Sequence, residues 1–145
     1  MTEHDAVLTH IYTVLTGSAA LASHVSTKIY LDNAPSGTAV PMLSYSIVDI
    51  NDRGYIGRKV GVEPRPGYWE CNFQITVWDK AETPVTTNIT PAHEDAYNAL
   101  TVSSSQAPYV IYPPIRTQTL PRSFEHSGIK YRGVVVQYTC IITKP

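Results

Sequence analysis

Histidine, cysteine and carboxylate side chains could bind a metal or move a proton, so their spacing is the first observation. No two histidines have the i, i+4 spacing of a helical metal site, and neither Cys71 nor Cys140 has a second ligand nearby in the sequence. The sequence therefore predicts no metal and no cofactor, and both thiols are interpreted as small core hydrophobic residues. The five histidines are His4, His10, His24, His93 and His126.

The densest titratable cluster is His93-Glu94-Asp95. Consecutive residues of a helix point in different directions, so these three side chains do not converge on one substrate and are interpreted as a solvated helix face. The glycines form no phosphate-binding loop, and no GxSxG nucleophile motif occurs. The sequence predicts no enzymatic activity.

A basic and aromatic segment, residues 51–69, is the strongest candidate for a binding surface. Its mixture of rings and cations resembles a surface that stacks on nucleic acid, but Asp52 and Glu63 dilute it and the whole chain is slightly acidic. Tyr, Trp and Arg are also the residues enriched at protein interfaces, which is the favoured interpretation. The candidate interface residues are Arg53, Tyr55, Arg58, Lys59, Arg65, Tyr68 and Trp69.

Length and composition indicate one domain of 145 residues with a formal net charge of -1. That charge provides no global field that would favour nucleic acid or a membrane as the main partner. Residues 1–52 nevertheless carry a net charge of -4 and residues 104–145 carry +4. These regions either balance within one subunit or meet head to tail between copies. No apolar run has the length of a membrane helix and no signal peptide is recognised, so the chain is expected to stay in the cytoplasm where it is made.

Hydrophobic periodicity predicts the elements. A capped helix is expected over residues 3–16, followed by a short helical turn, and a second main helix over residues 91–101. Alternating residues predict strands near 42–50, 70–78 and 133–143. The segments YVIY and IRTQTL are also interpreted as β-structure, and the stretch that contains Ser127-Gly128 as a turn-rich linker.

The expected fold class is α+β, with a single mostly antiparallel sheet, two main helices on one face of it, and a long hairpin loop. Residues 51–69 form that loop, because 19 residues far exceed the usual two to five of a hairpin connection. The residues expected to face the core are Phe73, Ile75, Val77, Val136 and Tyr138.

The order of these elements, with several local strings, resembles the tail-completion (tail-terminator) family of siphophages and related prophages. The resemblance rests on the N-terminal helix leading into LTGSAALASHVSTKIYLDNAPSGTAVPMLSYSIVD, on the FQITVWDKA strand, on the following helix and on the closing strand. The insertion-like residues 51–69 and 83–90 depart from the family pattern.

The resemblance implies a structural virion protein of the tail and neck that forms a hexameric ring. Such a ring would cap the head-proximal end of the tail tube, contact the tail tube protein and a head-tail connector or stopper protein, and let DNA pass through its lumen. Two alternatives are another neck component, such as a head-completion or stopper protein, and a small intracellular ligand-binding domain.

Overall fold

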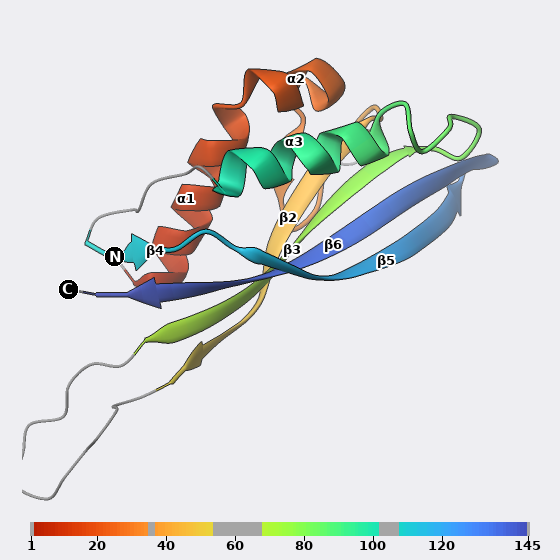
Figure 1. Ribbon diagram of the computed structural model, residues 1–145. Coiled ribbons are helices and arrows are strands. Elements are labelled where there is room, and N and C mark those ends of the chain that lie inside the picture. The colour runs from red at the N-terminus through yellow and green to blue at the C-terminus, as the bar shows by residue number, and fades with distance from the viewer. Residues whose placement is uncertain (1, 35–36, 54–67, 102–107, 145) are drawn as a thin grey trace, which may run out of the picture.

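The computed structural model describes residues 2–34, 37–53, 68–101 and 108–144, and shows three helices over one face of a six-stranded, curled sheet (Figure 1). Tyr55, Arg58, Lys59 and Arg65, four of the expected interface residues, lie outside the described residues. The elements are α1 (Glu3–Thr16), α2 (Ala19–Val25), β1 (Ile29–Leu31), β2 (Met42–Asp52), β3 (Trp69–Lys80), α3 (Ile89–Thr101), β4 (Val110–Ile111), β5 (Ile115–His126) and β6 (Ile129–Thr143).

The N-terminal helix begins at a capping box, as its sequence predicts. The backbone N–H of Asp5 donates to the Thr2 hydroxyl at 3.2 Å, and the Thr2 N–H donates back to the Asp5 carboxylate at 3.2 Å. Ser18 caps the second helix by accepting a hydrogen bond from the Leu21 N–H at 3.2 Å. The short helical turn expected here is therefore a complete helix, and the prediction of two main helices is corrected to three.

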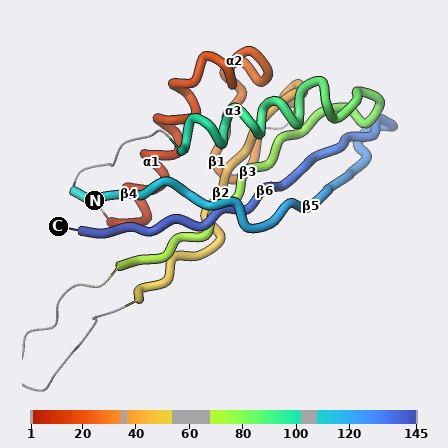
Figure 2. The backbone as a smooth tube through the Cα atoms, viewed as in Figure 1, coloured from red at the N-terminus to blue at the C-terminus, as the bar shows by residue number. Residues whose placement is uncertain are grey.

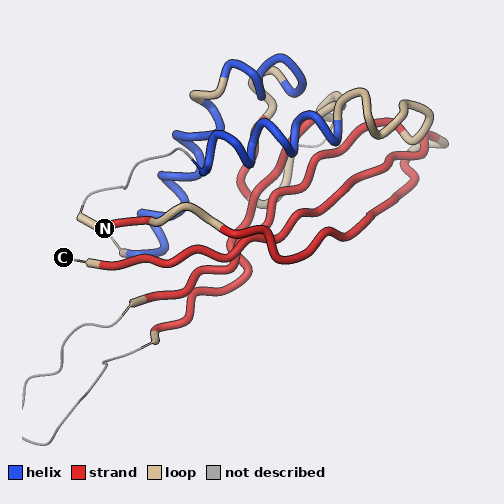
Figure 3. Tube along the Cα trace, viewed as in Figure 1, coloured by secondary structure: helices blue, strands red, loops and turns tan. Residues whose placement is uncertain are grey.

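The sheet has the order β1-β2-β3-β6-β4, and β5 pairs with β6 along the same edge as β4. Among the described strands only β1 and β2 pair in parallel, so the expected mostly antiparallel sheet is confirmed. The expectation of a sheet with two main helices packed on it is corrected to a molecule dominated by its strands. Figure 3 separates the helical layer from the strand layer.

The core lies between the helices and the middle strands. Phe73 of β3 stands opposite Tyr138 of β6, and their rings stack with centroids 5.1 Å apart. Ile75 also stands directly opposite Val136 on β6, and Cys71 stands opposite Cys140. All five residues expected to face the core are buried, which confirms the strand register. Both thiols are buried and free, as expected.

The last third of the chain differs from its prediction between residues 121 and 132, whereas YVIY and IRTQTL lie largely in strands, as expected. The expected turn-rich linker is two strands, β5 and β6, which continue to a tight turn at Ser127 and Gly128. Both turn residues have positive φ, 52° and 78°, the backbone that a two-residue hairpin requires. Figure 2 shows β5 following β6 along the edge of the sheet.

Candidate assembly interfaces

The residues at both ends of the predicted interface segment that the structure describes lie at the end of the β2–β3 pair. The Arg53 N–H donates to the Tyr68 carbonyl at 2.8 Å, and the Arg53 guanidinium forms an ion pair with Glu70 at 3.1 Å. Both charged side chains are partly exposed, so solvent weakens this pair. The strands thus hold Arg53 and Tyr68 side by side, and the predicted loop between them lies outside the described residues.

Two of the predicted interface residues occupy different environments. Trp69 is half-buried, packs against the core and meets the Tyr109 ring edge-on at 5.8 Å. Tyr68 lines a surface hollow of about 280 Å³ together with Ile115 and Ile141, whose side chains are exposed. Trp69 therefore serves mainly the fold, whereas Tyr68 lies beside exposed apolar surface suited to a protein contact.

The β5–β6 hairpin carries an aromatic cluster that was not among the predicted interface residues. Phe124 stacks on Tyr131 with centroids 4.8 Å apart and meets Trp78 of β3 edge-on at 5.0 Å. Phe124 is 42% exposed. We call Trp78, Phe124 and Tyr131 the aromatic cluster.

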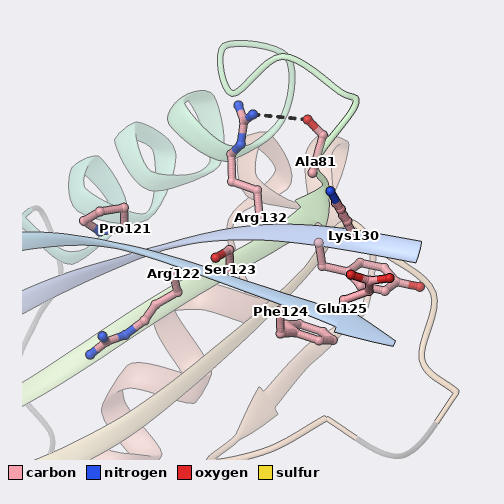
Figure 4. Close-up of a pocket in the computed structure, with 9 residues that line it drawn as sticks. Ala81, Pro121, Arg122, Ser123, Phe124, Glu125, Lys130 and Arg132 are labelled. Carbon is pink, nitrogen blue, oxygen red and sulfur yellow. Dashed lines mark hydrogen bonds between the residues drawn. The ribbon is translucent and has the colours of Figure 1, made fainter. Parts of the chain in front are cut away.

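Two surface hollows adjoin the aromatic cluster. One, of about 680 Å³, lies between this cluster and the segment around residues 32–42, with Met42 and Ile129 in its wall. The other, of about 670 Å³, follows the hairpin itself and is lined by Pro121, Arg122, Lys130 and Arg132 (Figure 4). Aromatic rings beside arginines are the combination that most often contributes binding energy at protein interfaces.

The two arginines of the hairpin hollow have different roles. Arg132 donates to the Ala81 carbonyl at 3.2 Å and so ties β6 to the end of β3. Arg122 extends the opposite way in Figure 4 and forms no ion pair within the described part of the chain. Its charge is available to a partner.

The His93-Glu94-Asp95 cluster diverges, as its helical spacing predicts, but only part of it is a solvated face. His93 is buried and its Nε2 lies 2.8 Å from the Val134 carbonyl, so its interpretation as a solvated residue was wrong. Glu94 accepts from Arg116 at 2.9 Å, and Asp95 lies 3.1 Å from His24 of α2. These contacts bind α3 to β5 and to α2.

Burial determines the protonation of the residues under α3. It lowers the pKa of His93 to about 4, so the ring is neutral and donates from Nε2 to the carbonyl. It also raises the pKa of Tyr138. The Nδ1 atom of His93 and the Tyr138 hydroxyl have no hydrogen-bond partner among the described atoms. This region is part of the packed core.

Within the described residues, no group of three His, Cys, Asp or Glu side chains is arranged to hold a metal ion. Over the same residues no single helix has the length and apolar composition to cross a membrane, although α1 and α2, bent by 80°, meet those criteria as a pair.

Sequence reasoning missed the hairpin surface because residues 121–132 mix a proline, charges and small residues with few apolar ones. Proline argues against a central strand but is tolerated on an edge strand. The signal that was present is Ser127-Gly128 with Phe124 and Tyr131 at matching distances on either side, a spacing typical of a tight hairpin.

Two solved structures are similar in fold. One is a chain described as "Virion of native gene transfer agent (GTA) particle", with a TM-score of 0.62, 19% sequence identity, and coverage of 94% of this chain and 96% of that chain. A second, whose description names no function, has a TM-score of 0.56 and 10% identity, and covers 97% of this chain and 96% of that one. No curated protein sequence matches this chain.

A match to a family model shows which family the chain belongs to, which the fold similarities alone do not show. The model described as "Tail completion protein gp17" matches residues 9–96, which is more than half of the chain. The match extends from within α1 through β1, β2 and β3 into α3. The chain therefore belongs to the tail completion protein gp17 family and is a structural protein of phage tails.

Proposed function

We propose that this protein is a non-enzymatic ring subunit of the virion that caps the head-proximal end of the tail tube. The ring stops tube growth and presents a surface to which the head joins. The observation that carries the proposal is the family match, which covers all three helices at least in part. The subunit is made in the host cytoplasm and becomes part of the neck.

The shape of the subunit supports assembly into a ring. All three helices lie on one face of the sheet, so no described helix covers the other face, which can make contacts with partners (Figures 1 and 3). The middle of that open face carries uncharged amides and hydroxyls. They include Ser46, Gln74 and Gln137, which are half-buried neighbours on β2, β3 and β6.

The proposed partners follow from the surfaces. The aromatic cluster with Arg122 fits a contact between proteins, because the exposed Phe124 ring gains when a partner removes it from water and the Arg122 guanidinium can pair with a partner's carboxylate. Residues 51–69 are proposed to contact a neighbouring subunit or the tail tube protein. A connector or stopper protein would bind the head-facing side of the ring, and six copies would leave a lumen for DNA.

A strain that produces phage particles without this chain tests the proposal. If the chain ends tube growth, electron micrographs will show tails of uncontrolled length that are not joined to heads, and expression of the chain will restore both features. A stopper protein would give a different result, namely tails of normal length beside heads that lose their DNA. That second outcome would replace the proposed role with the neighbouring one.

A further inference from the structure

The sheet has two open edges within the described residues, and both are long enough to pair with another strand. On the side of β2 away from β3, β1 covers only residues 43–45, so residues 46–52 have no described strand on that side. At the other edge of the sheet β5 pairs with β6 over its whole length and with no other described strand. Open edges present unpaired backbone donors and acceptors. From these edges we propose that β5 of one subunit pairs with the open part of β2 of a second copy.

The strand directions fit this pairing. Three antiparallel steps, β2 to β3, β3 to β6 and β6 to β5, separate the two edges, so β5 and β2 run in opposite directions. A second copy rotated about an axis along the strands therefore offers its β2 antiparallel to β5. Contacts of this head-to-tail kind close into a ring when the rotation closes. The inference thus rests on the proposed ring and specifies its interface.

The charges at the two edges are complementary. The open part of β2 carries Asp49 and Asp52, whereas β5 carries Arg122, Glu125 and Arg116, which pairs with Glu94. Asp49 accepts hydrogen bonds from Asn51 at 2.9 Å and Asn72 at 2.6 Å, which fix its carboxylate on the strand. The negative charge of the open part of β2 and the net positive charge of β5 favour this partner, whereas two β2 edges would repel.

The level of the strands adds a geometric requirement. Across the sheet, Ile47 lies level with Phe73, Tyr138 and Arg116, so the open part of β2 is level with only the beginning of β5. If β2 of the second copy pairs with the rest of β5, that copy must be shifted along the strand direction. Closed sheets require such a stagger between strands. The neighbours in the ring are therefore tilted rather than simply side by side.

Proline at position 121 identifies the backbone groups that face the neighbour. Pro121 has no N–H to donate to Val134, its partner on β6, so its nitrogen lies on the side of the open edge. Alternate residues of a strand have the same orientation, so Thr119 and Ser123 direct their N–H groups to the open edge. Ser123→Pro removes one outward donor and leaves the bonds to β6 in place. Ser123→Ala keeps that donor and is the matched control.

The proline test measures assembly of the full-length protein. Ser123→Pro should raise the concentration for half-assembly about tenfold, equivalent to one lost hydrogen bond per interface, while Ser123→Ala assembles normally. Circular dichroism checks that both variants fold. Normal assembly of a folded Ser123→Pro protein overturns the inference.

Disulfide trapping tests the same pairing without a folding risk, because all of the substituted positions are exposed. One protein carries Val48→Cys or Asn51→Cys on β2, and the other carries Thr119→Cys or Ser123→Cys on β5. Mixtures of a β2 variant with a β5 variant should cross-link on oxidation, whereas either alone, or a β5 variant mixed with Thr90→Cys, should not.

The outcomes separate this inference from the proposed function. Rings that form in every sample without any β2–β5 cross-link refute the edge pairing and leave the ring role intact. A protein that remains monomeric both in solution and with tail tubes contradicts both.

Discussion

Gly133 of β6 and Trp78 of β3 are directly opposite, and the indole fills the space that a side chain at position 133 would take. A Cβ atom built on Gly133 would lie 2.4 Å from Cε3 of the indole. Because Trp78 also contacts Phe124, this one glycine positions the aromatic cluster.

Gly133→Ala is therefore expected to displace the Trp78 ring and destabilise the subunit by about 1 to 3 kcal/mol, the usual cost of overpacking. The measurement is tryptophan fluorescence with chemical denaturation in a Trp69→Phe background, which leaves Trp78 as the single reporter. An unchanged emission maximum and midpoint would show that the ring does not depend on Gly133.

The two phenylalanines of the chain provide a matched pair for the core. Phe73 is buried and stacked on Tyr138, so Phe73→Ala should lower the free energy of unfolding by about 3 to 5 kcal/mol. Phe124 is exposed, and Phe124→Ala should cost about 1 kcal/mol through its ring contacts. Equal losses for the two variants would contradict the placement of the core.

His93 should make stability depend on pH. Burial lowers its pKa in the folded protein to about 4, below the ordinary 6.5, so as pH falls through this range the unfolded chain takes up a proton that the folded chain does not. The free energy of unfolding should therefore decrease from pH 6.5 to 4, by up to about 3 kcal/mol from this residue. Burial also lowers the pKa of His10, which adds a decrease of the same sign.

His93→Gln isolates the contribution of His93, because its amide can still donate to Val134 but does not titrate. Denaturation curves at several pH values should show a weaker decrease for the variant. If the native and variant curves are parallel, His93 is not the titrating group.

The segment predicted from the sequence as an interface gives a salt-dependent prediction. Arg58→Ala with Lys59→Ala should weaken assembly at low salt while the subunit stays folded, and the difference from the native protein should shrink as salt screens the charges. Light scattering measures the effect, with Lys28→Ala and Lys144→Ala as the charge-matched control. An equal effect of both double variants would remove the special role of this segment.

The core could be predicted from the sequence because buried strands and helices have apolar residues at regular spacing. Alternation from Cys71 to Val77 located β3 and its inward face, and the capping box at Thr2 located α1. The second half of β5 could not be found this way, although IRTQTL at its beginning was expected to be β-structure. Nearly all its side chains are exposed, so no hydrophobic alternation marks it, and its pairing with β6 supplies the order that its own residues do not.

The candidate interface was harder to predict because composition does not tell which way a ring points. Trp69 and Tyr68 are neighbours, yet one packs on Tyr109 and the other lines a surface hollow. Trp78 was assigned to the end of a core strand, and only the fold brings Phe124 and Tyr131 to it from the last third of the chain. Contacts between residues so far apart in the sequence can be predicted only when the order and register of the strands are known.

The most direct test of the proposed role is the position of this protein in assembled particles. The measurement is an electron cryomicroscopy reconstruction of the neck, from particles in which a small tag marks the subunit. We expect one ring of copies, between the last ring of the tail tube and the head connector, with the β5 edge of each copy against β2 of the next. Density for this chain along the tube, at the distal tip or nowhere in the particle would contradict the account.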